Sequence, residues 1–226
     1  MVRVAVLRFP GTNCDLEMAW AVERAGAEAE FVWHEDGGLA EYDAVIIPGG
    51  FTYGDYVRAG AIAARSPIME EVREFAEEGR PVLGVCNGMQ ILAEAGLIPG
   101  TLTVNRGNRF ICDWVHLRVE RADTPFTGRY REGEVLRIPI AHAEGRYYVE
   151  DPDRVEDRVV FRFCGPGGEV EDRYNPNGSV RGITGVVNGE GNVLGMMPHP
   201  ERAAHRLQGS DDGLRLFQSL VEWCRG

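Results

Sequence analysis

The chain has 226 residues, of which 44% are hydrophobic and 26% are charged, a composition typical of a globular protein. This composition excludes a disordered tail, a collagen-like fibre and a small scaffold that depends on disulfides. A chain of this length can bury most of the surface that its unfolded form exposes. Because no linker, repeat or low-complexity stretch interrupts the sequence, we expect one domain over residues 1–226.

The net charge is −11, from 35 acidic and 24 basic residues. This balance argues against a nucleic-acid-binding protein, which carries a basic face. All 24 basic residues are arginine. Without lysine, the chain can form neither a lysine Schiff base nor the lysine–phosphate contact of a P-loop. We therefore expect any ATP used in the reaction to bind to another chain.

The five cysteines are odd in number and scattered, which suits a reducing compartment better than a disulfide framework. The apolar N-terminal segment is interrupted by Arg3 and Arg8 and lacks the plan of a signal peptide. No segment approaches the ~20 consecutive apolar residues that a membrane-spanning helix needs. We expect a cytoplasmic protein that does not bind membranes.

The first hundred residues alternate between short apolar runs and amphipathic segments. The apolar runs predict strands at residues 2–7, 29–33, 44–47 and 81–85. Helices are predicted between or after them: from a cap at Asn13 or Asp15 to Ala25, from Ser66-Pro67 to a stop at Gly79, and at residues 89–95. Alternating strands and helices indicate a parallel sheet covered by helices, with functional residues at the carboxyl ends of its strands.

After residue 100 the pattern changes to short alternating segments separated by turn clusters. Strands are predicted at residues 102–104, 115–119, 135–140, 159–163, 183–187 and 193–197. A final helix, capped by Ser210 or Asp211, carries Leu214, Phe217, Leu220 and Val221 on one face. We therefore predict an α/β fold with a mainly parallel central sheet flanked by helices, extended by antiparallel strands in the second half.

The sequence Gly84-Val85-Cys86-Asn87-Gly88 lies between a predicted strand and a predicted helix. It matches the nucleophile-elbow pattern G-x-S-x-G with cysteine in place of serine. The glycines permit a sharp turn that presents Cys86 at the helix N-terminus, where a thiolate is favoured and the Asn87 N–H can meet an oxyanion. The pattern predicts that Cys86 is a nucleophile; the alternative is a small buried cysteine without a chemical role.

A base for this nucleophile is predicted in the segment Met197-Pro198-His199-Pro200-Glu201, which follows a predicted strand. A thiol nucleophile needs a base, and the base needs an orienting group. Residues two apart in an extended segment point to the same side, so we expect the Glu201 carboxylate to accept a hydrogen bond from His199. The result is a predicted Cys86–His199–Glu201 triad; a solvated turn is the alternative.

The segment Pro48-Gly49-Gly50-Phe51 also follows a predicted strand. Backbone N–H groups of Gly50 and Phe51 can complete an oxyanion hole with the Asn87 N–H, although an ordinary tight turn has the same sequence.

For a metal ion, neither Cys112 with His116 nor His199 with His205 forms a full ligand set. We therefore expect no metal site.

Taken together, these motifs resemble those of the class I (triad) glutamine amidotransferases. Within this family the chain is most similar to the glutaminase subunits of phosphoribosylformylglycinamidine synthases, which act in purine biosynthesis. The matching segments cover residues 9–15, 49–56, 58–63, 84–90, 141–146, 174–179 and 195–202, which is nearly the whole chain. One departure is Ala143, which stands where the family usually has glycine after the histidine.

The resemblance implies a flavodoxin-like fold and a role for each matched residue. It implies that Cys86 attacks the side-chain amide of glutamine and forms a γ-glutamyl thioester, which water then hydrolyses. His199, oriented by Glu201, would protonate the departing ammonia and later activate water. Gln90, one helical turn after Cys86, would contact the substrate.

The resemblance also implies partners. A large synthase subunit would bind ATP and Mg²⁺ and use the ammonia to convert formylglycinamide ribonucleotide to the amidine, and a small third subunit would bridge the two. No cofactor is expected in this chain. Residues 51–65, rich in glycine and aromatic residues, are either a loop that senses the partner or an ordinary surface loop.

Two other functions remain open from the sequence alone. The same elbow also serves cysteine hydrolases and peptidases, which would cleave peptides rather than free glutamine. A catalytically silent interaction subunit would keep the fold without the activity. In that case Cys86 would react with a glutamine-like electrophile no faster than Cys14 or Cys164.

Overall fold

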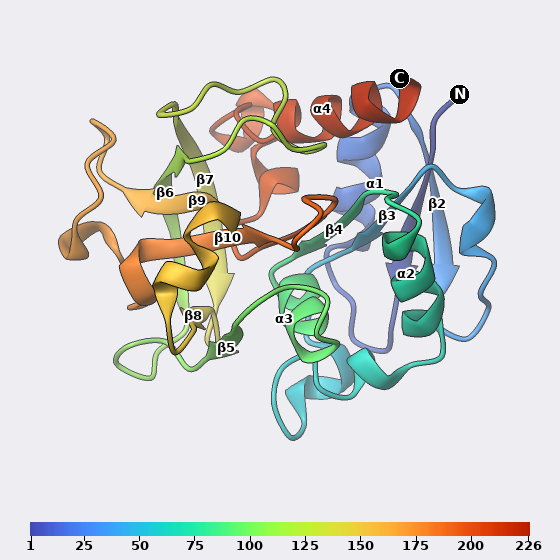
Figure 1. The fold of residues 1–226 in the computed structure, drawn as a ribbon, viewed down its shortest axis with the longest axis horizontal. Helices are drawn as coiled ribbons and strands as arrows, with labels where there is room; N and C mark the ends of the chain where they lie inside the picture. The colour runs from blue at the N-terminus through green and yellow to red at the C-terminus, as the bar shows by residue number, and fades with distance from the viewer.

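The structure is a computed structural model that describes residues 1–226, and a nine-stranded sheet runs through it (Figure 1). In spatial order the strands of this sheet are β2 (Glu28–Trp33), β1 (Arg3–Arg8), β3 (Ala44–Ile47), β4 (Val82–Val85), β11 (Val193–Met196), β10 (Ile183–Val187), β9 (Val159–Cys164), β6 (Ile111–Val119) and β7 (Val135–His142). A small sheet pairs β5 (Thr101–Thr103) with β8 (Arg146–Tyr148). The α-helices are α1 (Asp15–Arg24), α2 (Ile68–Glu77), α3 (Asn87–Glu94) and α4 (Leu214–Arg225).

The first five strands of the sheet, from β2 to β11, are mutually parallel. Every residue of β3, β4 and β11 is buried, which explains why these strands are continuous apolar runs. The strand order is that of a doubly wound, flavodoxin-like sheet, with β11 as the fifth strand. The prediction of a parallel sheet flanked by helices is therefore confirmed.

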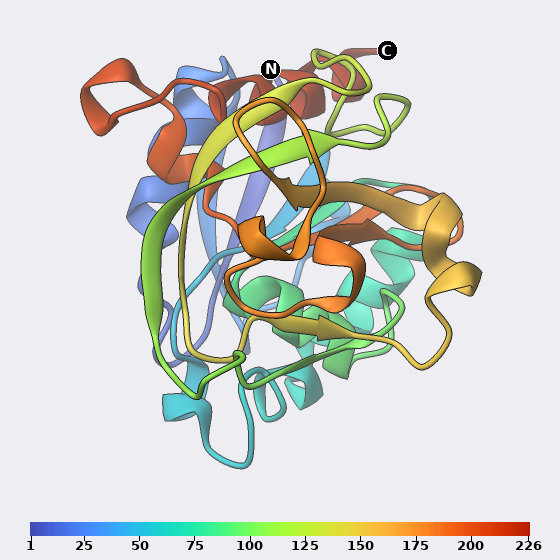
Figure 2. The same cartoon turned by 90° about the vertical axis from the view of Figure 1, so that its left-hand side faces the viewer.

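The other four strands, β10, β9, β6 and β7, extend the same sheet by antiparallel pairing. Figure 2 shows β6 and β7 as long, curved strands at one side of the molecule. Both are longer than predicted, because residues 111–118 pair one-to-one with residues 135–142 and each strand satisfies the backbone groups of the other. Strand β8 was not predicted; it lies beside β5, outside the large sheet.

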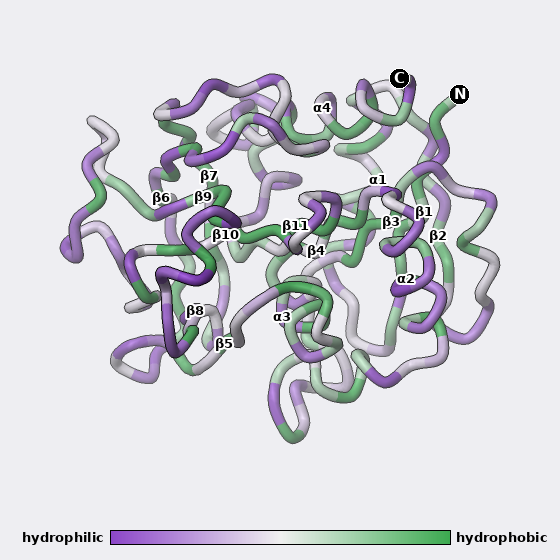
Figure 3. The backbone as a smooth tube through the Cα atoms, viewed as in Figure 1, coloured by the Kyte–Doolittle hydropathy of each residue, from purple (hydrophilic) through white to green (hydrophobic).

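Helices α1 and α4 contact each other on one side of the parallel strands, and α2 and α3 cover the other side (Figure 1). The hydrophobic core comprises 58 buried residues and extends from these layers into the antiparallel half of the sheet. The strands at the centre of Figure 3 are green, which marks hydrophobic residues. The longest helix, α4, has 12 residues, and no helix combines the length and hydrophobicity that a membrane crossing needs.

The helix starts differ from the predicted caps. Cys14 occupies the N-cap position of α1 without a capping hydrogen bond, and the carboxylate of Asp15, one of the two predicted caps, pairs with Arg8. Helix α2 starts one residue later than predicted, at Ile68. Helix α4 starts after Gly213, which packs so closely on Pro200 that an added Cβ would lie only 2.2 Å from the Pro200 carbonyl oxygen.

Candidate active site

Two parallel neighbours, β4 and β11, end at the same edge of the sheet. Val85 of β4 is in register with Met196 of β11, and the Cys86 N–H continues the pairing by donating to the Met196 carbonyl at 2.8 Å. Cys86 and His199, which lie far apart in the sequence, follow these two strand ends. The sheet topology therefore brings the predicted nucleophile and the predicted base together.

Cys86 adopts φ 52° and ψ −107°, a strained conformation for a residue with a side chain, and α3 begins at the next residue. The flanking glycines permit the close packing of this turn. An added Cβ at Gly88 would lie 2.0 Å from the Ile47 carbonyl oxygen, and one at Gly84 would lie 2.5 Å from Leu92 Cδ1. The predicted elbow is thus present, with Cys86 between the end of β4 and the start of α3.

His199 Nδ1 lies 2.6 Å from Glu201 Oε1, and both side chains are buried. The basis for predicting this contact was wrong: Glu201 lies in a 3₁₀ turn over Pro200–Ala203, not in an extended segment. His199 is held in place by its own N–H, which donates to the Pro139 carbonyl of β7 at 2.8 Å.

Burial alone lowers the pKa of His199, but the Glu201 carboxylate and the neighbouring Cys86 sulfur raise it, and the resulting pKa is well above the usual value. The imidazole and Cys86 meet across Gly49. A methyl group there would lie 2.8 Å from His199 Cε1 and 3.4 Å from Cys86 Cβ. Only glycine leaves room for the two side chains to approach each other at this point.

The segment after β3 offers one of its two predicted oxyanion donors. The Phe51 N–H donates to the Gly11 carbonyl at 2.9 Å and is therefore engaged within the protein. The Gly50 N–H donates to no protein acceptor. A side chain at Gly50 would lie 2.7 Å from the Gly11 carbonyl oxygen, so the tight approach of residues 11 and 50 requires glycine.

Asn87 and Gln90 link the first turn of α3 to two neighbouring segments. Asn87 Oδ1 accepts from the Thr52 N–H at 3.2 Å, and its amide donates to Gln90 Oε1 at 2.8 Å. The Gln90 amide in turn donates to the Glu144 carbonyl at 2.7 Å. Gln90 is 5% exposed, so its observed contacts are with the protein at the edge of the site.

The end of β7 forms a wall of the site that sequence reasoning missed. The Ala141 carbonyl oxygen lies 3.7 Å from Cys86 Sγ. Next to it, burial and the charge of His199 lower the pKa of His142 to about 4, and His142 Nδ1 lies 3.1 Å from Asn105 Oδ1. His142 is therefore a neutral imidazole near neutral pH.

Ala143, where the family usually has glycine, is exposed and does not adopt a positive φ, so alanine fits there.

Residues 1–224 match the model of the CobB/CobQ-like glutamine amidotransferase domain. The chain belongs to this family. It is 81% identical over 225 residues to the phosphoribosylformylglycinamidine synthase subunit PurQ of Methanopyrus kandleri and 60% identical to that of Pyrococcus furiosus, with 100% of both chains covered in each case. A solved structure of PurLQS from Thermotoga maritima matches with a TM-score of 0.90 and 45% identity over 98% of both chains.

In this glutamine amidotransferase, residues 51–65 form a strained loop that begins at the site and is cyan in Figure 1. Tyr53, Asp55 and Val57 all have positive φ, and Val57 is β-branched, which makes its φ of 70° unusual. Burial and the charge of Glu144 raise the pKa of Asp55 to about 6, and Asp55 Oδ1 has no hydrogen-bond partner.

We expect replacement of Asp55 by Asn to stabilise the protein above pH 6. In the folded protein the pKa of Asp55 is about 6, whereas an aspartate carboxyl in the unfolded chain has its ordinary pKa of 3.8, so stability is lost as the pH rises between these values. The variant should melt roughly 2–4 °C higher than the parent at pH 7.5, and the gain should shrink toward pH 4. Asn tolerates a positive φ better than most residues, so the substitution can also raise the melting temperature equally at every pH. Only the part of the melting-temperature shift that depends on pH therefore tests the prediction. An equal gain at both pH values would contradict it.

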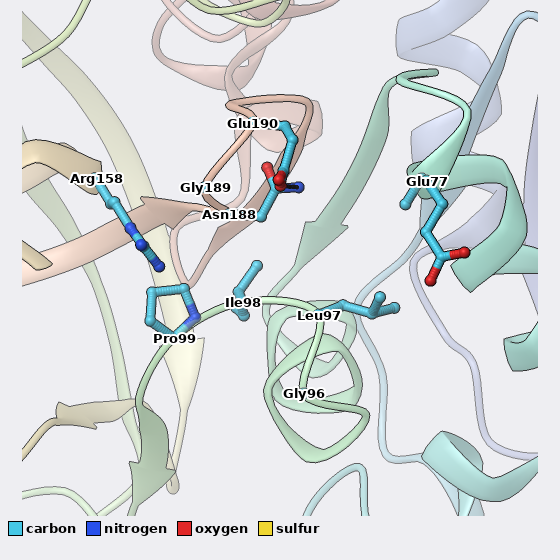
Figure 4. Close-up of a pocket in the computed structure, with 10 residues that line it drawn as sticks. Glu77, Gly96, Leu97, Ile98, Pro99, Arg158, Asn188, Gly189 and Glu190 are labelled. Atoms are coloured by element: carbon cyan, nitrogen blue, oxygen red, sulfur yellow. Dashed lines mark hydrogen bonds between the residues drawn. The ribbon is translucent and has the colours of Figure 1, made fainter.

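The larger cavities of the molecule lie away from Cys86. One of about 460 Å³ is lined by the ends of α2 and α3 and by the turn from β10 to β11, with Arg158, Asn188 and Glu190 at its rim (Figure 4). This turn precedes β11, so the cavity lies at the opposite edge of the parallel strands from the candidate site. A second cavity, of about 560 Å³, contains Arg106, Arg162 and Arg181, each paired with a carboxylate.

Proposed function

We propose that this chain is the glutaminase subunit of a phosphoribosylformylglycinamidine synthase, which releases ammonia from glutamine and supplies it to a synthase subunit. The proposal is carried mainly by the strained Cys86 beside the buried His199–Glu201 pair. The relatives matched over their full length are named as phosphoribosylformylglycinamidine synthase subunits, which supports the assignment to this synthase.

In the first half-reaction, Cys86 Sγ attacks the side-chain carbonyl carbon of glutamine. The carbonyl oxygen becomes an oxyanion that accepts hydrogen bonds from the N–H groups of Gly50 and Asn87. His199 Nε2 gives a proton to the departing ammonia, and the C–N bond breaks. The products are ammonia and a γ-glutamyl thioester on Cys86.

In the second half-reaction, His199 Nε2 takes a proton from water, and the resulting hydroxide attacks the thioester carbonyl. The same N–H groups hold the second oxyanion, and glutamate leaves as the Cys86 sulfur is restored. Throughout, the Glu201 carboxylate accepts from His199 Nδ1 and stabilises the imidazolium, as in other triads. Gln90 contacts the substrate once glutamine enters beside the first turn of α3.

The synthase subunit binds ATP and Mg²⁺ and converts formylglycinamide ribonucleotide to the amidine, while this chain carries no cofactor and works in the cytoplasm. A small bridging subunit completes the complex. We place the docking surface for the synthase subunit on the exposed apolar side chains beside the site: Phe51, Tyr56, Val57, Ile62 and Phe110. Phe51 and Phe110 stack with ring centroids 6.5 Å apart, and Phe51 directly follows Gly50, so ammonia would leave next to this surface.

The test is ammonia release from free glutamine by the chain alone and with its synthase subunit. We expect glutamine hydrolysis that the subunit accelerates, and no cleavage of peptides. A peptidase would cleave peptides instead. A silent subunit would hydrolyse neither substrate, and a glutamine-like electrophile would label Cys86 no faster than Cys164. The strain at Cys86 favours an active enzyme, because strained backbone at a residue with a side chain is concentrated at active sites.

A further inference from the structure

Cys14 is a buried thiol in the candidate site that the proposed reaction does not use. It is 3% exposed and free, and its N–H donates to the Gly49 carbonyl at 3.1 Å. A methyl group at Gly49 would lie 3.1 Å from Cys14 Sγ, on the same side as His199 Cε1. A second sulfur therefore lies beside the predicted base, contributed by the loop that precedes α1.

The atoms around Cys14 form a set of metal ligands. Cys14 Sγ, a ring nitrogen of His199 and a carboxylate oxygen of Glu201 all lie within 4.8 Å of one another. Ligands bound to Zn²⁺ at about 2.0–2.3 Å can lie at most roughly 4.6 Å apart, so small movements would suffice. The ring nitrogen that faces Glu201 is His199 Nδ1, 2.6 Å from Oε1, so Nδ1 is the ring atom that can share an ion with this carboxylate. The other carboxylate oxygen, Glu201 Oε2, is buried and has no hydrogen-bond partner.

Arg202 now supplies the positive charge next to this sulfur. Its Nη2 lies 3.1 Å from Cys14 Sγ, while its Nε contacts Glu17 Oε2 at 3.1 Å. The Arg202 side chain is 34% exposed, so it can swing toward solvent with Glu17. A divalent cation and the guanidinium would compete for the same position beside Cys14.

We propose that Cys14, His199 and Glu201 form a binding site for a thiophilic divalent ion such as Zn²⁺, and that the bound ion inhibits glutamine hydrolysis. Two protons leave to solvent when the ion binds, one from the Cys14 thiol and one from Nδ1 of the His199 imidazolium, and water fills the fourth position of a tetrahedral site. With Nδ1 on the ion, the neutral His199 ring keeps its one proton on Nε2 and has no free lone pair to accept another, so it can no longer act as the base of the reaction. The inhibition rests on the proposed function, whereas the binding does not.

Binding is tested by titrating Co²⁺ into the full chain and recording the near-ultraviolet absorption of a cobalt–thiolate bond. We expect the band in the parent and in Cys86→Ala, and its loss in both Cys14→Ser and Cys14→Ala. Arg202→Gln should tighten binding about tenfold, because it removes the competing charge. Cys224→Ser, which removes a thiol at the far end of α4, should leave the band unchanged. A band that survives in the Cys14 variants but disappears in Cys86→Ala would overturn the site.

Inhibition is tested with Zn²⁺ in the ammonia-release assay, with each variant scaled to its own metal-free rate. The parent should lose activity with Zn²⁺ and regain it with a chelator. Cys14→Ala should need at least about tenfold more Zn²⁺ for half inhibition. Equal sensitivity of the parent and Cys14→Ala would refute the inhibitory role of this site. A chain that binds Co²⁺ through Cys14 but releases no ammonia from glutamine would refute the proposed function and leave the site intact.

Discussion

Replacing Cys86 with alanine will abolish amidine synthesis from glutamine and will spare synthesis driven by added ammonium salt. Alanine lacks the sulfur that forms the thioester, so glutamine-dependent turnover in the assembled complex should fall by about 10³-fold or more. The ammonium-driven reaction needs only the synthase subunit. The measurement compares both nitrogen sources in the holo-complex at equal protein concentration.

The matched control for this experiment is Cys224→Ser. The Cys224 thiol contacts the Asp43 carbonyl, which precedes β3 and lies at the edge of the sheet opposite Cys86. This variant should retain both activities. Loss of both activities in Cys86→Ala would mean that the subunits do not divide the reaction as proposed, or that the variant no longer assembles. Gel filtration of the complex separates these two explanations.

The parallel part of the fold could be predicted from the sequence because local patterns determine it. The strand at Ala44–Ile47 was predicted with its observed bounds, since a buried parallel strand needs an uninterrupted apolar run. The caps were not predicted correctly, because the residues at the helix starts make contacts outside their helices that a capping pattern does not show: Asp15 pairs with Arg8, and Gly213 packs on Pro200. Strand β8 was missed because its residues also read as part of a loop.

The residues of the site likewise fall into two groups, those that a local sequence pattern predicts and those that only the fold brings together. Cys86 could be found from its flanking glycines, and His199 and Glu201 from a short segment after a strand, because each pattern is local. Cys14 and His142 lie in segments that match the family, but their place in the site could not be predicted, because only the folded sheet brings the loop before α1 and the end of β7 to Cys86. The engagement of the Phe51 N–H by Gly11 likewise depends on a contact between segments that are distant in sequence.

Replacing Glu201 with glutamine should lower glutamine hydrolysis by about 10³-fold or more while the protein stays folded. Glutamine has nearly the same shape as glutamate but carries no charge to stabilise the His199 imidazolium, and its amide can present an N–H to Nδ1 and favour the wrong tautomer. The rate should fall mainly in kcat, because Glu201 lies behind the imidazole. Glu17→Gln, which also removes a carboxylate beside Arg202, is the matched control and should change the rate little.

The pH profile of kcat/KM makes this prediction specific. Burial lowers the pKa of His199, and the Glu201 carboxylate and the Cys86 sulfur oppose that effect. Without the carboxylate, the pKa of His199 falls, so the imidazolium that protonates ammonia is lost at a lower pH. The alkaline limb of the profile in Glu201→Gln should therefore move toward acid relative to the parent and to Glu17→Gln. A uniform drop in rate with an unmoved limb would show that Glu201 acts only by holding the ring in place, because a charge that stabilises the imidazolium must also set its pKa.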